Sequence, residues 1–547
     1  MKTVLLVGTS LVALATSGAM AQDRSKTSRA APCDPYVNYS CLDAYLGDDV
    51  FTRFIRYYQL EWGRDAAPSD PKAPPSRRAG WPATPQSTPP MPFTEWPYGG
   101  STAIGVTRPN SVDSPLMAAI ANTGFGKWLN ENNVQIYGWV NAGGNLSTNK
   151  VKPGGNWPAA YDFTPNTFQL DQAVVYFERL PDTVQTDHID WGFRIAAMYG
   201  ENYRYTTAYG LASHQLLGHN LYNGYDFPMV YGELYIPKIA EGLLLRVGRF
   251  ISLPDIEAQL APNNYMYSHS MAYSYDNYTN TGIQATLAVT KNLFLQLGLS
   301  VGTEAMPWHL NARIPNPLPN PLFPETTFKK DPGAMPSITG CLRYQTDSGR
   351  DNVYLCADAI NSGTWGYNNL QWYGGTYYHK FNDKWHVSFE GYTLFQKNVP
   401  NVTDPLGIIA AGGTPFLTPG SGILFNAPNF AFCKDPNVLS CTAQVYALLM
   451  YLNYKATPLD NITLRTEFYN DIHGQRTSVP TRYWDVALGW QHWWSPQIEM
   501  RPELAFYRAV DKPAFNGNFN VSPLGANAIA PNKQNAVIFA CDFIIHF

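Results

Sequence analysis

Charged side chains recur within short segments in which apolar and polar residues alternate. Alternate side chains of an extended strand point to opposite faces, so each of these charges shares the polar face of its segment. They are Arg194, Glu233, Arg246, Arg343, Asp358, Glu390, Arg465, Glu467, Asp485, Glu499, Arg501 and Glu503. Opposite charges that face each other across a pore create a transverse field that favours polar, hydrated solutes. Because the signs are mixed, the set predicts a hydrophilic passage without a preference for anions or cations, and a closed interior with paired charges is the alternative.

A long polar loop follows the segment that ends in Gly248-Arg249-Phe250. Residues 251–282 read ISLPDIEAQLAPNNYMYSHSMAYSYDNYTNTG and include the acidic Asp255 and Glu257, the paired Asn263 and Asn264, and many hydroxyl groups. A loop of this length could fold inward and narrow a channel, with Asp255 and Glu257 closest to a passing solute. An ordinary extracellular loop is the alternative.

Motifs for catalysis are not evident. The sequence contains no H-E-x-x-H, P-loop or G-x-G-x-x-G motif, which would mark metal, phosphate or dinucleotide chemistry. His379 and His386 flank a short turn in HKFNDKWH, where an interfacial or interior-facing pair is a simpler interpretation than a metal site. We therefore predict no enzyme, no metal site and no cofactor.

The elements that must position these charges are strands. Aromatic residues make up 14% and charged residues 15% of the 547 residues, whereas charged residues make up about 25% of a typical soluble domain. The mean hydropathy is −0.25, which fits alternating strands better than packed apolar helices. From residue 134 onward about 16 alternating segments follow one another, a number within the even range of bacterial outer-membrane barrels.

The connections between these segments alternate in length. Short turns such as PKIAE, TKN and FND are separated by long loops rich in Pro, Gly and Asn. A barrel inserted from the periplasm keeps its short turns on the periplasmic side and its long loops outside. We therefore expect an all-β fold, a transmembrane antiparallel up-and-down barrel. In its final segment Phe539 and Phe543 would face lipid, and Asp542 and His546 would face the interior.

The N-terminal region differs from the rest of the chain. Residues 1–21 have a Lys at position 2, an apolar stretch and an Ala-x-Ala cleavage site, as in a secretory signal peptide. Residues 22–130 are predicted to form a periplasmic segment with one short amphipathic helix, within residues 42–58, and a Pro-rich linker. The barrel would comprise residues 131–547. The formal net charge of −4 gives no reason to expect binding of nucleic acid.

The seven cysteines suggest disulfides in an exported chain. Cys33 and Cys41 could close a small loop, as could Cys433 and Cys441. A symmetric turn at DSGR would place two further cysteines, Cys341 and Cys356, opposite each other on neighbouring strands. Cys541 has no evident partner and is expected to fill space.

One stretch resembles a known family. Gly248-Arg249-Phe250, Glu257, the Pro-Asn at 262 and 263, Ser268 and Ser270, and Thr-x-Thr-Gly at 279–282 resemble the putative β-barrel porin-2 family, the OmpL-like group. Together with IYGWVNAGGNLS and the terminal aromatic residue, the resemblance extends from about residue 134 to 547. It implies an outer-membrane barrel with porin activity and supplies no catalytic residues.

These observations predict a porin in the outer membrane of a Gram-negative bacterium, a passive diffusion channel for small hydrophilic solutes or ions. Its partners would be outer-membrane lipid, the solutes, the assembly machinery during insertion and possible further copies of the chain. A structural or adhesion barrel is the first alternative, and an outer-membrane lipid hydrolase is the second.

Overall fold

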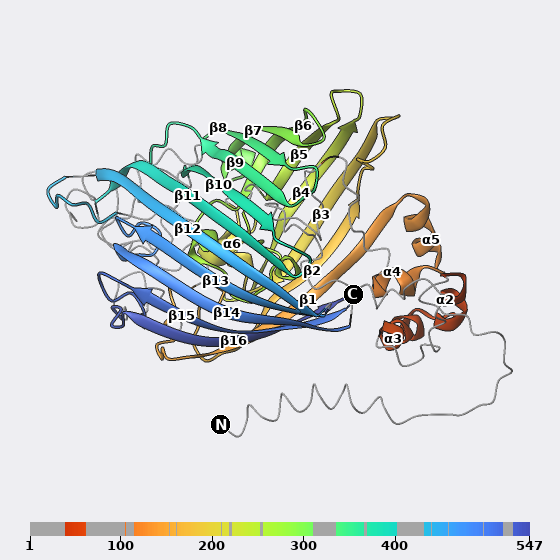
Figure 1. Ribbon diagram of the computed structural model, residues 1–547, viewed down its shortest axis with the longest axis horizontal. Coiled ribbons are helices and arrows are strands. Elements are labelled where there is room, and N and C mark those ends of the chain that lie inside the picture. Colours follow the sequence, from red (N-terminus) through yellow and green to blue (C-terminus); the bar gives the residue numbers. More distant parts are fainter. Residues whose placement is uncertain are drawn as a thin grey trace, which may run out of the picture.

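The fold is a closed barrel of antiparallel strands (Figure 1). It is seen in a computed structural model that describes residues 39–61, 104, 114–152, 154–159, 161–208, 210–217, 221–251, 255–309, 335–365, 369–401, 431–438, 440–457, 459–495, 497–517 and 529–547. The strands are β1 (Val134–Ser147), β2 (Phe168–Arg179), β3 (Asp190–Gly200), β4 (Gly224–Ile236), β5 (Leu243–Ile251), β6 (Thr279–Ala288), β7 (Leu293–Thr303), β8 (Ser337–Gln345), β9 (Asp351–Ile360), β10 (Gln371–Lys380), β11 (Trp385–Pro400), β12 (Ser440–Thr457), β13 (Asp460–Asp471), β14 (Thr481–Ser495), β15 (Ile498–Ala509) and β16 (Asn535–His546). The predicted barrel of about 16 strands is therefore confirmed.

Side chains alternate between the outer surface and the interior of the barrel. In β14, Trp484, Val486 and Leu488 are 50%, 46% and 56% exposed, whereas Asp485 is 0% exposed. This pattern follows from the period of two along a strand. Since a charge that faces lipid near the bilayer centre costs roughly 2–4 kcal/mol, the apolar face suits hydrocarbon and the polar face suits the interior.

The barrel closes between its first and last strands. Trp139 of β1 pairs with His546 of β16, and Ser147 pairs with Ile538 at the other end of the ladder. The backbone N–H of Gly138 also donates to the carbonyl of Phe547 at 3.0 Å. Closure satisfies backbone groups that would otherwise form two free sheet edges.

Short and long connections alternate around the barrel, as the sequence predicts. Residues 237–242, 289–292 and 381–384 are short turns, whereas residues 148–167 and 201–223 are long loops. The connection between β3 and β4 carries the short helices α6 (Tyr203–Thr206) and α7 (His214–Leu217), and the connection between β5 and β6 carries α8 (Met271–Ser274). The short 3-10 helices are η1 (Ala261–Asn263) and η2 (Pro307–His309).

Two helices stand where one was predicted. Helix α2 (Tyr39–Leu46) ends at Gly47, whose φ of +86° is a left-handed conformation that favours glycine, and α3 (Val50–Glu61) follows. Asp49 caps α3 by accepting the Thr52 N–H at 2.8 Å. Hydrogen bonds from the Thr52 side chain and backbone hold the pKa of Asp49 below its ordinary value.

Two further helices precede β1 and were not predicted. Helix α4 (Pro115–Ile120) begins after Ser114, which accepts the Met117 N–H, and α5 (Gly124–Glu131) begins after Thr123. An N-cap serine followed by proline is a recognisable start signal. Buried Arg53 of α3 joins the two halves of the cluster by donating to the Ala118 carbonyl at 2.8 Å.

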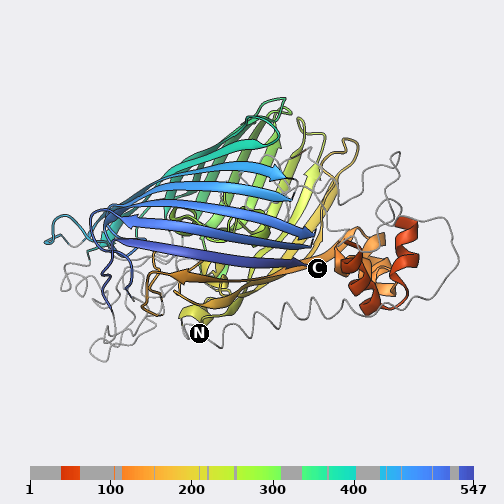
Figure 2. The same cartoon turned by 60° about the horizontal axis from the view of Figure 1, so that its bottom comes forward.

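The helical cluster, α2 to α5, lies beside one end of the barrel. Figures 1 and 2 both place it at the end where the C-terminus lies. The hydroxyl of Tyr58 donates to the backbone carbonyl of His546, which connects α3 to β16. The described residues include no helix with the length and apolar character needed to cross a membrane.

Candidate functional site

The connection between β5 and β6 runs through the inside of the barrel. We call its described residues, 255–278, the crossing loop. Near its start the Ile256 N–H donates to Glu390 of β11 at 3.0 Å. A few residues later the Ala261 N–H donates to Gln172 of β2 at 3.1 Å. The crossing loop therefore contacts widely separated parts of the wall.

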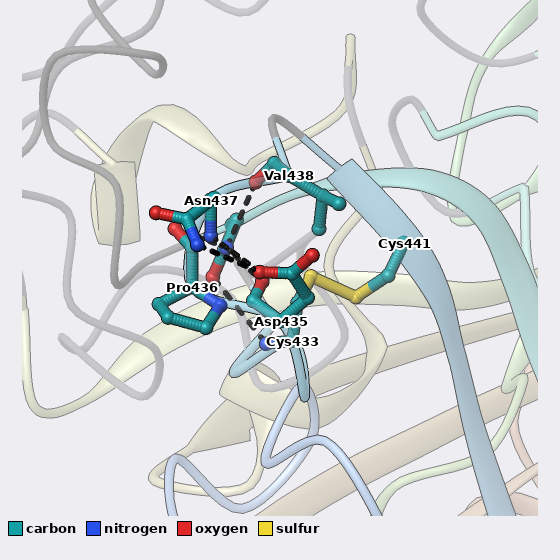
Figure 3. The surroundings of a disulfide bond; sticks show 7 residues. Cys433, Asp435, Pro436, Asn437, Val438 and Cys441 are labelled. Atoms are coloured by element: carbon teal, nitrogen blue, oxygen red, sulfur yellow. Dashed lines mark hydrogen bonds between the residues drawn. A yellow bond between two sulfur atoms is a disulfide. The ribbon is translucent and has the colours of Figure 1, made fainter.

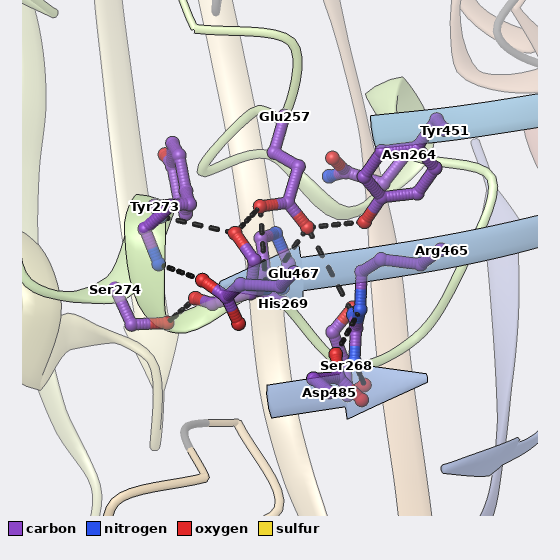
Figure 4. Close-up of polar contacts among 12 residues, drawn as sticks. Glu257, Asn264, Ser268, His269, Tyr273, Ser274, Tyr451, Arg465, Glu467 and Asp485 are labelled. Carbon is purple, nitrogen blue, oxygen red and sulfur yellow. Dashed lines mark hydrogen bonds and ion pairs between the residues drawn. The ribbon is translucent and has the colours of Figure 1, made fainter. Parts of the chain in front are cut away.

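Glu257 connects the crossing loop to the wall (Figure 4). Its carboxylate accepts hydrogen bonds from the hydroxyl of Tyr451 on β12 and from the hydroxyl and backbone N–H of Ser270. The guanidinium of Arg465 lies 3.9 Å from the same carboxylate. Glu257 is 4% exposed, so these contacts replace its hydration.

Arg465 of β13, the cross-strand neighbour of Tyr451, makes further contacts with the crossing loop. It forms an ion pair with Asp485 of β14 at 2.6 Å and donates to the Ser268 carbonyl at 3.0 Å and to the Tyr507 hydroxyl at 3.1 Å. The Ser268 N–H donates to Glu503 of β15 at 3.0 Å. A buried charge-assisted network of this kind fixes both the loop and the wall.

Helix α8 is held at its N-terminus by a wall carboxylate. Glu467 of β13 accepts the backbone N–H groups of Met271 and Ala272, and Ser270 caps the helix by accepting the Tyr273 N–H at 3.0 Å. The first N–H groups of a helix have no partner within the helix. The wall carboxylate and the capping serine supply partners for three of them.

Arg501 of β15 holds the middle of the crossing loop. It donates to the carbonyls of Ala261 and Asn264 at 2.6 and 2.9 Å, and it forms an ion pair with Asp542 of β16. The side chain of Asn264 turns back and accepts the Ala258 N–H at 2.8 Å. Both ends of this contact are buried.

The end of the crossing loop is also anchored by carboxylates. Asn277 donates to Asp358 of β9 at 3.2 Å. The Tyr278 N–H donates to Glu304 at 2.6 Å, just before β6 begins. Of the residues proposed from the sequence, the structure thus brings Asp358, Glu390, Arg465, Glu467, Arg501 and Glu503 into direct contact with the loop.

The remaining charged residues of the set pair within the wall. Arg194 donates to Glu178 at 2.6 Å and to the Tyr231 hydroxyl at 2.9 Å. Arg246 forms an ion pair with Glu233 at 2.8 Å and lies over the Tyr231 ring. Glu178 was missed by sequence reasoning, although it occupies the polar face of its strand.

Two more of these residues face the interior from opposite sides of the barrel. Arg343 of β8 lies over the Phe294 ring at 4.9 Å. Glu499 of β15 accepts a hydrogen bond from Gln491 at 2.6 Å and lies 3.2 Å from His546.

The interior is more tightly filled than the sequence predicts. All twelve charged residues proposed from the sequence are at most 5% exposed, where a water-filled interior was expected. Aromatic residues of several loops occupy the space, as in the stack of Tyr161 on Tyr205 at 4.2 Å and on His269 at 3.7 Å. No periodicity marks these loop residues, so the sequence carries no signal for this filling.

A small cavity remains between the crossing loop and the wall. It has room for roughly one water molecule. Its lining comes from the loop and from strands β11 and β12, and consists of Ile256, Glu257, Asn263, Asn264, Tyr265, Ser388, Tyr451 and Asn453. Asp255 lies outside this lining and is 2% exposed. Three of the four loop residues singled out from the sequence therefore meet at one place.

Two disulfides lie in the described residues. Cys341 and Cys356 are bonded and stand at opposed positions of β8 and β9. Cys433 and Cys441 are bonded across a compact turn at the start of β12 (Figure 3), and Asn401 donates to the Val438 carbonyl of this turn. Cys541 is free. The proposed partner of Cys41, Cys33, lies outside the described residues.

A hydrolase-like spacing occurs once on β7 without hydrolase geometry. Residues 298–302 read G-L-S-V-G, but Ser300 lies within a strand and not at a strand-to-helix turn. Its hydroxyl contacts Asn280 and Ser337, each at 3.3 Å. His379 is partly exposed and His386 is buried, so the two histidines lie on opposite faces of the wall.

The barrel matches a known family. Residues 133–547 match the family described as Putative beta-barrel porin-2, OmpL-like. No curated protein matches the chain in sequence. This match begins just before β1 and covers every strand of the barrel.

Solved structures with some likeness to this chain include a porin and two proteins described as belonging to the outer membrane. The anion-selective porin from Comamonas acidovorans is 9% identical, with a TM-score of 0.42 over 76% of this chain and 99% of that one. The outer membrane channel DcaP of Acinetobacter baumannii is 10% identical, with a TM-score of 0.40 over 76% of this chain and 97% of that one. OmpT of Vibrio cholerae is 8% identical, with a TM-score of 0.38 over 76% and 97%.

Proposed function

The chain belongs to the Putative beta-barrel porin-2, OmpL-like, family, and on this premise we propose that it is a passive diffusion channel for small hydrophilic solutes or ions. In this proposal residues 1–21 direct export, residues 22–130 stay in the periplasm, and the barrel of residues 131–547 resides in the outer membrane. Its apolar outer face contacts lipid, or further copies of the chain where it assembles.

The observation that carries the proposal is the crossing loop. It is held in the lumen by hydrogen bonds that it donates to wall carboxylates on β9, β11, β13 and β15. A segment anchored in this way sets the narrowest cross-section, so solutes are selected by size and by the surrounding charges. The small cavity beside Glu257, Ser388 and Asn453 is one place where loop and wall are not closely packed.

Planar bilayer recordings test the channel directly. The purified chain should give discrete conductance steps, which neutral polymers block once they are small enough to enter. The steps should be small, because the crossing loop fills much of the lumen. A correctly folded barrel that inserts and stays silent under all voltages would contradict the channel.

Asp255 and Glu257 should contribute to ion selectivity. Replacing both, as Asp255→Asn with Glu257→Gln, removes two negative charges from the crossing loop, so the permeability ratio should shift toward anions. The measurement is the reversal potential in a salt gradient. Asp347→Asn, in an exposed turn, is the matched control and should leave the reversal potential unchanged. An unchanged reversal potential in the double variant would mean that these two residues do not line the constriction.

A further inference from the structure

Three buried carboxylates meet where the crossing loop joins the wall. Asp255 stands at the start of the loop, Asp276 near its end, and Glu390 on β11. One carboxylate oxygen of each lies within 4.8 Å of the others. The three side chains are 2%, 0% and 3% exposed, so bulk water does not solvate their charges.

These carboxylates lack the partners that several other interior carboxylates have. Asp485 and Asp542 each form an ion pair with an arginine, and Glu467 accepts two backbone N–H groups. Within the part of the chain that the structure describes, no lysine or arginine forms an ion pair with Asp255, Asp276 or Glu390.

Four of their six oxygens have no hydrogen-bond partner. These buried atoms are both carboxylate oxygens of Asp276, Oδ1 of Asp255 and Oε1 of Glu390. The Ile256 N–H donates to the other oxygen of Glu390, at 3.0 Å. A buried carboxylate without a partner is strongly unfavourable as an anion, so it either takes up a proton or is compensated by a cation.

We propose that Asp255, Asp276 and Glu390 form a binding site for one divalent cation of the calcium type. Calcium ions take oxygen ligands at about 2.3–2.6 Å in flexible geometry, so two ligands on opposite sides of the ion stand roughly 5 Å apart. The separation of up to 4.8 Å among these oxygens matches that span. Water and backbone carbonyls complete the coordination, which commonly needs about six to eight oxygens.

The site joins the two ends of the crossing loop to one strand. An ion held there crosslinks Asp255 and Asp276 through Glu390, and its loss leaves like charges in contact. Calcium therefore stabilises the inward position of the loop. Binding itself does not depend on conduction, whereas an effect of calcium on conductance rests on the proposed channel function.

Equilibrium dialysis with radioactive calcium tests the site. The full chain is refolded in detergent without lipopolysaccharide, which itself binds divalent cations, and is treated with a chelator before titration. We expect one saturable calcium ion per chain, with a dissociation constant of about 10⁻⁴–10⁻³ M, as in extracellular calcium modules. Absence of saturable binding would overturn the proposal and would indicate that protons neutralise the carboxylates.

Single substitutions test whether calcium binds at these three carboxylates. Asp276→Asn and Glu390→Gln should each weaken calcium binding by roughly tenfold or more, because affinity depends on the number of charged ligands. Asp347→Asn, an exposed carboxylate in a turn, should bind calcium as the wild type does. Binding that survives in both buried variants would overturn the assignment.

Thermal unfolding provides a second readout should Asp276→Asn fail to fold. Calcium should raise the unfolding temperature of the wild-type barrel and of Asp347→Asn, and it should raise that of Glu390→Gln much less. Equal shifts in all three proteins would contradict the site. These measurements are made without a bilayer, so they separate failure of the cation site from failure of the channel.

Discussion

Replacing residues 252–278 by a short glycine-serine turn should raise the single-channel conductance several-fold. Ile251 and Thr279 pair directly across β5 and β6, so a turn of about four residues can join the two strands without distortion. The replacement removes the crossing loop from the lumen and leaves the wall strands intact. Planar bilayer recordings in the same salt measure the change.

The loopless barrel should also become selective for cations. The wall groups that lose a loop partner are four carboxylates, Asp358, Glu390, Glu467 and Glu503, and two guanidinium groups, Arg465 and Arg501. The loop takes the acidic residues Asp255, Glu257 and Asp276 with it, but carboxylates outnumber cations among the wall groups that water then reaches, so the uncovered surface attracts positive ions. A control that places the same glycine-serine segment at residues 346–350, a short turn, should keep the wild-type conductance. Equal conductance in all three proteins would mean that the crossing loop does not limit passage.

Replacing Arg465 by methionine should destabilise the barrel by roughly 3–5 kcal/mol, because it leaves Asp485 buried without its partner. Both side chains are 0% exposed. The second change in Arg465→Met with Asp485→Leu removes the orphaned charge and should restore much of the lost stability. Urea unfolding of the refolded barrel in detergent measures the free energy of unfolding.

An exposed ion pair provides the control for this experiment. Arg482 and Asp511 form an ion pair at 2.6 Å in which the side chains are 50% and 39% exposed. Arg482→Ala should leave the free energy of unfolding unchanged within error, since water screens such pairs. If Arg465→Met proves equally harmless, the interior charges are solvated and the lumen is wetter than the packing indicates.

The strands were predictable because their signal is local. The alternation around Asp485, with Trp484 and Val486 on the other face, is readable from neighbouring residues alone. The same rule placed Arg465 and Glu390 on the inner face. Strand number, face and the order of short and long connections therefore follow from the sequence.

The partners of those residues were not predictable, because they depend on register and on distant segments. Arg194 faces Glu178 only through the alignment of β2 with β3. The contact of Arg465 with Ser268 joins residues 197 positions apart. Whether a long loop lies inside or outside a barrel is decided by such contacts, which leave no periodic trace in the sequence.

The boundaries of the helices in the helical cluster have local signals in the sequence, although only one helix was predicted there. Gly47 interrupts the amphipathic pattern, and Ser114 followed by Pro115 marks a helix start. The side chains of α3 also depart from a simple amphipathic pattern, because Phe51 is 74% exposed and Arg53 is buried. A buried arginine that bonds backbone carbonyls does not appear in a hydrophobic pattern.

The pairing of β1 with β16, which closes the barrel, constrains the order in which the strands can assemble. Asn141 of β1 donates to Asp542 of β16 across 401 residues of chain. Until β16 arrives, β1 presents an unsatisfied row of backbone groups, which is a template for incorrect pairing with other strands. Contacts so distant along the chain form slowly. We therefore expect that a helper protein covers the unpaired edge of β1 during insertion. We also expect β1 and β16 to pair only at the last step.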